Sequence, residues 1–364
     1  MQPESEVVSV NLPNKILSGF WKEGHVQGIA VDAERGHVYY SFTTILLKTD
    51  LQGNPLGSVR NLAGHLGCIT FDSKRRRVYG SLELKHDSIG KGIIDRTGWD
   101  PCQEDNFYLV SFDIDAIDRM GLDAEADGIM RSVWLKDVVS NYTAVDPVSG
   151  QKHHYGCSGF DGTGLGPVFG AAPDSPEKIM VAYGIYSQTD RTDNDHQVLL
   201  QFDPDIFAQY GQSLNQSSPH HNGPEKAEAR YFLYTGNTRW GVQNLEYDPA
   251  SRQWLVCVYT GQKEDFTNFP MFLIDGTVAP REEALTGRAG EVGKVLTLAD
   301  ASQTGLRGIP GCNFPLGSTG VCALGDGRFY FSNPLKNIEE KTFCSEVLLH
   351  RMDKSAPNLF VPCE

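Results

Sequence analysis

The sequence contains no apolar run that approaches the ~20 residues of a membrane-spanning helix, and we therefore expect no membrane partner. Basic residues are also few, because 32 lysines and arginines stand against 46 acidic residues and leave a net charge of −14. Binding to nucleic acid depends on clustered Lys and Arg, so we expect no nucleic-acid partner. The one basic run, residues 74–77, falls in a predicted turn and is interpreted as a solvated surface feature.

The eight cysteines show no Cys-x-x-Cys spacing, which argues against a structural zinc site. Cys68, Cys257 and Cys322 lie in apolar segments, where buried free thiols are expected. A disulfide between Cys344 and Cys363 on the last two strands is the alternative, and it would imply export. No signal-peptide pattern is present. The expected location is therefore cytoplasmic, or secreted or periplasmic if a leader has been removed.

What the sequence does contain is a repeated hairpin phrase. Residues 64–81 read GHLGCITFDSKRRRVYGS, and residues 24–42 read GHVQGIAVDAERGHVYYSF. In both copies a histidine precedes an alternating apolar strand, a tight polar turn and a second strand, which is the pattern of a β-hairpin. Similar hairpins follow near residues 166–183, 242–259 and 320–332, so the phrase occurs five times.

Each hairpin is followed by two further strand candidates, which indicates five units of four antiparallel strands. One such sheet cannot bury both of its faces, whereas stacking the sheets around a ring does so. We therefore predict an all-β, five-bladed β-propeller that forms a single domain over residues 1–364, and an all-β sandwich is the alternative. The predicted blades span residues 24–63, 64–139, 154–236, 240–299 and 317–364, with residues 7–12 closing the ring.

The loops that precede the innermost strands share one face with most of the long inserts, so their residues meet at the mouth of the central channel. The predicted ligand-binding residues are His25, Gln27, His65, Asp161, Arg239, Trp240, Gln243, Ser318 and Thr319. Arg239 and Trp240 offer a charged group for a carboxylate and an aromatic surface for a sugar, with packing between blades as the alternative. The insert over residues 85–106 is a candidate lid for this mouth.

A metal ion on the propeller axis is a further hypothesis. The predicted metal ligands are His25, His65 and His154. Three imidazoles at matching repeat positions could hold Zn²⁺, although the third copy has two registers: residues 154–161 copy residues 65–72, but the apolar strand begins at Gly166. The side-chain oxygens of Asp161, Gln243, Ser318 and Thr319 would suit Ca²⁺ instead. Histidines that only cap strands, with ordered water in the channel, are the alternative to either ion.

Motifs for nucleophilic catalysis are absent, since the sequence has no Gly-x-Ser-x-Gly elbow. Asp161 is the one carboxylate well placed on the predicted inner strands, whereas glycosidases need two. No catalytic residue is assigned, and the oligomeric state stays open. The sequence therefore predicts a propeller that binds a small polar molecule, either a carbohydrate or a small organic acid, with or without a divalent ion. A metal-dependent hydrolase or lyase at the same mouth and a protein-interaction scaffold are the alternatives.

The phrases HVQGIAVD, GHLGCITFD, TDRTDNDHQVLLQFD and GNTRWGVQNLEYD resemble a family of uncharacterised bacterial β-propeller proteins, over about residues 24–332. More distantly, the hairpin phrase is similar to NHL-type and gluconolactonase-type propellers. The first resemblance implies the fold without an activity, and the second is an analogy of fold. Gluconolactonase-type propellers hold a divalent ion with an acidic and amide set, and this chain lacks the early glutamate of that pattern.

Overall fold

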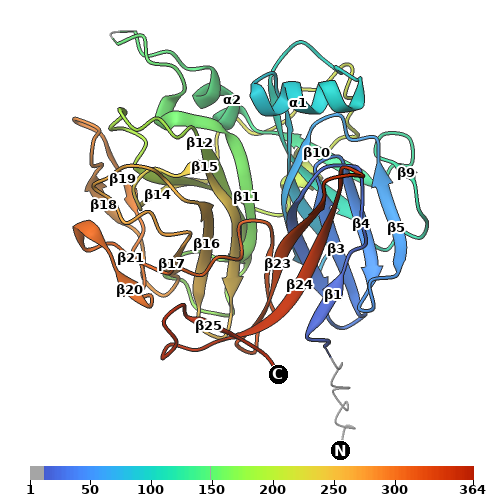
Figure 1. Cartoon of the computed structure of the whole chain (residues 1–364). Helices are drawn as coiled ribbons and strands as arrows, with labels where there is room; N and C mark the ends of the chain where they lie inside the picture. Colours follow the sequence, from blue (N-terminus) through green and yellow to red (C-terminus); the bar gives the residue numbers. More distant parts are fainter. Residues whose placement is uncertain (1–11, 148) are drawn as a thin grey trace, which may run out of the picture.

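The computed structural model describes residues 12–147 and 149–364, and it shows a five-bladed β-propeller (Figure 1). Five inner strands surround the axis, and each packs against the next around a closed ring. These strands are β2 (Val26–Asp32), β6 (His65–Asp72), β11 (Cys157–Pro167), β15 (Arg239–Asp248) and β22 (Val321–Ala323). The predicted fold class is confirmed, and the alternative of a sandwich is wrong.

The first two blades each contain four antiparallel strands in chain order from the axis outward. Outside β2, the first blade has β3 (His37–Phe42), β4 (Ile45–Asp50) and β5 (Pro55–Arg60), and the short β9 (Leu122–Asp123) pairs with β5. Outside β6, the second blade has β7 (Arg77–Leu84), β8 (Asn106–Asp113) and β10 (Met130–Trp134).

The third sheet takes a segment that the sequence places in the fourth blade. Outside β11 it has β12 (Glu177–Ile185), β13 (His196–Phe202), β14 (Ala229–Tyr234), β19 (Val292–Val295) and β18 (Arg281–Ala284). The fourth sheet has β15, β16 (Gln253–Tyr259) and β17 (Met271–Asp275). Within the predicted fourth-blade range 240–299, β19 pairs in parallel with β14 and sets Lys294 opposite Tyr231, whereas Leu298 forms a bridge with Ile274 of β17.

The fifth blade joins the two ends of the chain and closes the ring. Outside β22 it has β23 (Arg328–Asn337) and β24 (Thr342–Met352), and both β1 (Lys15–Leu17) and β25 (Phe360–Pro362) pair with β24. Closure by an N-terminal strand is therefore confirmed. Of the predicted closing segment 7–12, residues 7–11 lie outside the described residues, and the observed strand follows at Lys15.

Three of the five inner hairpins share one turn, and its geometry explains the repeat in the sequence. Asp32, Asp72 and Asp248 each end an inner strand, and each carboxylate accepts a hydrogen bond from the backbone N–H three residues later. The next residue has a positive φ in each copy, and these residues are Gly36, Arg76 and Arg252. An aspartate that caps a turn, followed by a left-handed residue, reverses the chain over a few residues.

Helices occupy loops between strands. The α-helices within the described residues are α1 (Ser88–Thr97), α2 (Lys136–Thr143) and α3 (Ile206–Tyr210). A 3₁₀ turn, η1 (His154–Gly156), precedes β11. A second, η2 (Leu306–Gly308), connects the two short strands of a small ladder, β20 (Gln303–Thr304) and β21 (Pro310–Gly311). α1 and α2 lie at the same end of the propeller, opposite β25 (Figure 1). Among the described residues, no helix combines the length and apolar character needed to cross a membrane.

The cysteines act as packing residues. All eight lie within the described residues and all are free, so the alternative of a Cys344–Cys363 disulfide is wrong. Cys68, Cys257 and Cys322 are buried, in agreement with the sequence. Burial raises the pKa of Cys68 to about 12, which keeps this thiol neutral at physiological pH.

Candidate functional site

Four inner strands depart from regular pairing at one end of the channel. Register shifts fall between Val26 and Gly28, Leu66 and Ile69, Phe160 and Gly162, and Val242 and Asn244. A β-bulge turns a side chain away from its regular direction in the sheet. Polar residues at or beside these irregularities consequently line a cavity at the channel mouth, and they are Gln27, His65, Asp161 and Gln243.

The cavity has a volume of about 310 Å³ and lies between the channel mouth and helix α1. The strands and their connections contribute His25, Gln27, Thr43, His65, Asp161, Trp240, Gln243 and Tyr259. One face of α1 contributes Ser88, Ile89, Gly92, Ile93 and Arg96. Because residues four apart lie on the same helix face, the insert between β7 and β8 covers the mouth with a continuous surface.

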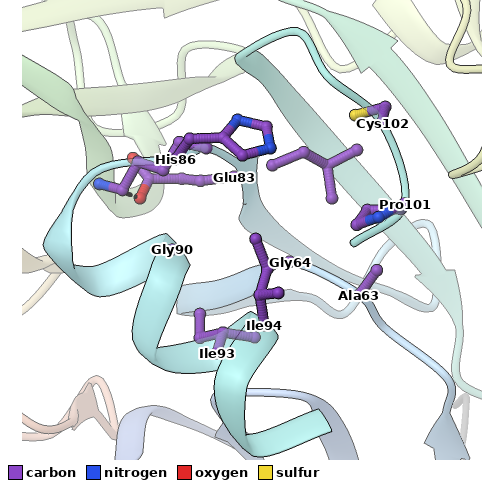
Figure 2. A pocket seen from close by; sticks show the side chains of 11 residues that line it. Ala63, Gly64, Glu83, His86, Gly90, Ile93, Ile94, Pro101 and Cys102 are labelled. Atoms are coloured by element: carbon purple, nitrogen blue, oxygen red, sulfur yellow. Dashed lines mark ion pairs between the residues drawn. The ribbon is translucent and has the colours of Figure 1, made fainter. Parts of the chain in front are cut away.

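Helix α1 is anchored firmly over this mouth. The Asp87 carboxylate caps the helix by accepting hydrogen bonds from the backbone N–H groups of Ile89 and Gly90, both at 3.0 Å. The same side chain accepts the Tyr186 hydroxyl at 3.0 Å. Behind the helix only a crevice of about 10 Å³ remains, against the start of β6 (Figure 2). A crevice of that size holds one water molecule at most, so α1 is packed onto the propeller.

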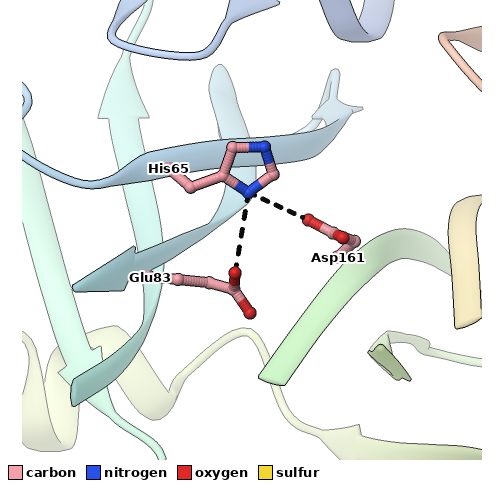
Figure 3. Close-up of side chains that lie close together, drawn as sticks. All are labelled: His65, Glu83 and Asp161. Carbon is pink, nitrogen blue, oxygen red and sulfur yellow. Dashed lines mark ion pairs between the residues drawn. The ribbon is translucent and has the colours of Figure 1, made fainter. Parts of the chain in front are cut away.

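A buried cluster of three ionisable side chains forms one wall of the cavity (Figure 3). The Nδ1 atom of His65 lies 3.4 Å from Oδ1 of Asp161 and 3.6 Å from Oε2 of Glu83. The three residues are 5%, 9% and 2% exposed in that order. None of these three facing atoms has a hydrogen-bond partner of good geometry among the described residues. His65 and Asp161 also face the cavity, while Glu83 lies behind them.

The outer atoms of the two carboxylates are held by other groups. Glu83 Oε1 accepts the Phe160 backbone N–H at 2.8 Å, and Asp161 Oδ2 accepts the Gln243 amide at 3.2 Å. The Lys85 ammonium lies 2.7 Å from Glu83 Oε2 and donates to the Ser158 carbonyl at 2.9 Å. These contacts fix both carboxylates with one oxygen each turned toward His65.

The charges in the cluster determine its protonation in the absence of other ligands. Burial lowers the pKa of His65, but the opposing effect of Asp161 and Glu83 is larger. The net result is a His65 pKa raised to about 9. Burial also opposes ionisation of Asp161, yet His65 and Lys85 hold the pKa of that carboxyl below its usual value. The protein alone therefore favours a protonated imidazole between two carboxylates.

Two glycines permit the close approach of these side chains. A Cβ at Gly67 would lie 2.5 Å from Oδ1 of Asp161 and would also clash with the Ser81 hydroxyl. A Cβ at Gly159, where φ is +120°, would overlap the Glu83 carboxylate. The hydrogen atoms at these positions make room for the carboxylates beside the backbone of β6 and β11.

His25 and Trp240 form the opposite part of the cavity. Burial, with a repulsive contribution from His65, lowers the pKa of His25 to about 4, so its ring is neutral at physiological pH. Its Nε2 atom lies 2.7 Å from the Gln27 amide nitrogen. Trp240 has a φ of 66°, which is rare for an aromatic residue. Strain of this kind is found preferentially at functional sites.

The structure brings together most, but not all, of the predicted site residues. His25, Gln27, His65, Asp161, Trp240 and Gln243 surround the cavity. Arg239 instead lines an adjacent hollow beside Trp240, Tyr259 and Gln262. Ser318 and Thr319 are not among the lining residues: Ser318 contributes only a carbonyl to Asn244, and the Thr319 hydroxyl donates to the Ser332 carbonyl.

The predicted set of three histidine ligands is wrong. His154 lies in η1, where its ring contacts Tyr155 edge-on and its Nε2 atom is 3.1 Å from Arg288. Among the described residues, the one group of His, Cys, Asp and Glu that could hold a metal is His65, Glu83 and Asp161. The copied phrase over residues 154–161 is misleading, because β11 runs on to Pro167 and its turn comes six residues later than the phrase implies.

Three charged residues of the site were not predicted from the sequence: Glu83, Lys85 and Arg96. Glu83 and Lys85 carry a signal, since they alternate with Leu82 and Leu84 at the end of an otherwise apolar strand, and both are buried. Charged residues in such positions are seldom buried without a partner. Arg96 carries no such signal, because only the fold of α1 places it over the mouth.

Comparisons with known proteins assign neither a family nor an activity to the chain. No protein-family model and no curated protein matches this sequence, so the resemblance to bacterial, NHL-type and gluconolactonase-type propellers stays a prediction. Among solved structures, the chain is similar to the β-propeller domain of Cps50 (Swd1) from Myceliophteria thermophila, with 7% identity, a TM-score of 0.34, and coverage of 93% of this chain and 74% of that one. It is also similar to hydrazine synthase from Kuenenia stuttgartiensis, with 13% identity, a TM-score of 0.35, and coverage of 90% and 83%.

Proposed function

We propose that the protein binds a small organic acid, and specifically a sugar acid that carries hydroxyl groups beside its carboxylate, in the cavity under α1. The observation that carries this proposal is the combination of groups around one volume of about 310 Å³: a guanidinium, two amides, a neutral imidazole and two aromatic rings, beside the His65–Asp161 pair. A pocket of this size with a few convergent polar groups is the usual form of a small-molecule site.

Arg96 is the carboxylate-binding group in this proposal. It projects from α1 into the cavity and forms no ion pair within the described part of the chain. Glu23, the carboxylate that acts on it electrostatically, is already paired with Arg60 at 3.1 Å. A guanidinium presents a planar fork of donors that matches a carboxylate. Among the lining residues, Arg96 is therefore the cation left for an anionic ligand, since the protonated His65 already faces Asp161 and Glu83.

The remaining lining groups suit the hydroxyl-bearing part of the ligand. Neutral His25 and the amides of Gln27 and Gln243 can each donate or accept hydrogen bonds. Trp240 and Tyr259 provide apolar surface against which a sugar ring can pack. A neutral sugar would leave Arg96 unpaired, so the proposal predicts a preference for the acid over the corresponding neutral sugar.

Binding of hexuronates and aldonates, measured by calorimetry beside the matching neutral sugars, tests this proposal. We expect the acids to bind the wild type, and Arg96→Gln to weaken them ~10–100-fold, because a hydrogen bond to a charged group contributes ~1.5–3 kcal/mol. Arg119→Gln is the control, since Arg119 is exposed and lies outside the cavity. Equal binding by both variants, or no binding of any acid, would overturn the proposal and favour a scaffold function.

A further inference from the structure

The three atoms that face one another in the buried cluster lack the hydrogen bonds that buried polar atoms ordinarily have. His65 Nδ1, Glu83 Oε2 and Asp161 Oδ1 are each buried without a well-formed hydrogen bond in the described structure, although the Lys85 ammonium forms an ion pair with Glu83 Oε2 at 2.7 Å. Unsatisfied buried polar groups are rare and costly in folded proteins. Here they come from three separate strands, β6, β7 and β11, and converge on one point.

Two of the three separations in the cluster match those between ligands of a single metal ion, and all three lie within 4.8 Å. Atoms held ~2.1 Å from one ion and ~110° apart lie ~3.4 Å from each other. The observed separations from His65 Nδ1 are 3.4 Å to Asp161 and 3.6 Å to Glu83. The second oxygen of each carboxylate is already fixed from outside, by the Gln243 amide in Asp161 and by the Phe160 backbone N–H in Glu83. Outer hydrogen bonds of this kind orient the ligands in established metal sites.

The local charge also favours a divalent cation. Lys85 lies within 4 Å of the carboxylates of both Glu83 and Asp87, and Asp161 is the third carboxylate of the group. Three carboxylates and one ammonium leave two negative charges when His65 is neutral. Isolated buried charge of that size is strongly unfavourable, and one divalent ion neutralises it.

We propose that His65, Glu83 and Asp161 bind one divalent transition-metal ion, with Zn²⁺ as the best-matched ion. One imidazole nitrogen and two carboxylate oxygens form a ligand set suited to Zn²⁺, whereas Ca²⁺ takes oxygen ligands. His65 and Asp161 line the cavity, so the fourth coordination position opens toward it. A water molecule or an anionic group of a bound molecule completes the coordination. This site stands on the buried atoms and does not depend on the proposed sugar acid.

Metal content and thermal stability of the full-length protein test the site. We expect one Zn²⁺ per chain by mass spectrometry, a lower Tm after chelation, and recovery when Zn²⁺ is restored. Co²⁺ in its place should give visible absorption bands of a four-coordinate site. His65→Asn and Asp161→Asn should each lower the affinity for Zn²⁺ by at least about tenfold, as expected for removal of a ligand. His196→Asn is the control, because His196 is equally buried but lies outside the cluster.

The absence of stoichiometric metal, together with a Tm that Zn²⁺ does not change, would overturn the proposal. An NMR spectrum of the Zn²⁺-treated protein in which His65 carries protons on both nitrogens would overturn it too. Wild-type metal affinity in His65→Asn would have the same effect. Arg96→Gln separates this site from the proposed function: it should bind Zn²⁺ like the wild type while the sugar acid binds weakly.

Discussion

At the scale of single residues, the site depends on glycines as much as on charged groups. Gly67 lies within the bulge of β6, two residues after His65, and its missing side chain leaves room for the Asp161 carboxylate and the Ser81 hydroxyl. The carboxylate therefore reaches His65 Nδ1 across the junction of two blades. Neighbouring blades supply different members of one cluster, which no single repeat contains.

The Gly67→Ala variant tests this dependence. The added methyl group would displace Asp161, so we expect metal affinity to fall ~10–100-fold, as for loss of groups that orient a ligand. Calorimetric titration with Zn²⁺ provides the measurement. Gly92→Ala is the control, because a Cβ there meets no atom within 4 Å. Unchanged affinity in Gly67→Ala would show that the approach of Asp161 to β6 is not needed.

Glu246 provides a second prediction at this scale, because it lines a separate cavity of about 300 Å³ together with Cys322 and Ala323. Burial raises the pKa of this carboxyl to about 8, although the Ala323 backbone N–H stabilises the charged form. The folded state therefore holds a proton that the unfolded chain releases at the ordinary glutamate pKa of 4.5. Stability consequently falls as pH rises from that value through about 8.

Glu246→Gln should accordingly raise the Tm at pH 9 and leave it nearly unchanged at pH 4, because the amide keeps the acceptor for Ala323 without the charge. Thermal denaturation of both proteins from pH 4 to pH 9 measures the difference. Glu340→Gln is the control, since Glu340 is exposed. Parallel curves for the wild type and Glu246→Gln would contradict the raised pKa.

At the scale of elements, helix α1 covers part of the channel mouth and so forms one side of the cavity. The helix is held at its start by Asp87. The rest of the insert is fixed by His86, whose two ring nitrogens each lie 3.1 Å from a carboxylate oxygen, one of Asp100 and one of Asp105. It carries Arg96 on the face that covers the mouth. The function that we propose therefore resides partly in an insert and partly in the repeats.

Asp87→Ala should loosen α1 without unfolding the propeller. Loss of a helix cap costs ~0.5–2 kcal/mol, and the substitution also removes the acceptor for Tyr186. We expect faster hydrogen exchange over residues 88–97, weaker binding of the sugar acid, and a small decrease in Tm. Lys91→Ala on the exposed side of the same helix is the control. Equal exchange in the two variants would contradict the anchoring role of Asp87.

At the scale of the whole molecule, the ring is closed by β1, whose three residues pair with β24. Ile16 is 2% exposed within this strand, whereas its neighbour Leu17 is 45% exposed. Within β1 the closure therefore depends on one buried apolar side chain and a short ladder of hydrogen bonds, and Ser18 and Trp21 extend the contact to Ser345 and Phe343 of β24.

Ile16→Ala should lower the free energy of unfolding by ~2–5 kcal/mol, the usual cost of a large-to-small change in a core. Leu17→Ala should change it by less than ~0.5 kcal/mol, as expected for a surface substitution. Urea denaturation of the two variants gives a direct comparison. Similar values for both would show that β1 does not hold the ring together.

The sequence predicts the architecture well because its repeats are local. Asp32, Asp72 and Asp248 cap the same turn, and each signal lies within a few residues. The site is harder to predict, because its members meet across blades. His154 matches His65 in the sequence, but the longer β11 carries it away from the mouth. Glu83 joins His65 only through strand pairing and a bulge.

Helix α1 was not predicted for a comparable reason. Its sequence, SIGKGIIDRT, contains two glycines and no acidic residue in its first turn, so its intrinsic helical preference is low. The cap at Asp87 and packing of Ile93 against the propeller stabilise it instead. Tertiary contacts of this kind cannot be read from the repeat pattern.

The most direct test of the account is anomalous diffraction from crystals of the protein grown with Zn²⁺. The account predicts one strong peak at the channel mouth, ~2.1 Å from His65 Nδ1, Glu83 Oε2 and Asp161 Oδ1, beneath α1 in a five-bladed ring. The absence of a peak there, or a peak between His25 and His154 instead, would contradict it.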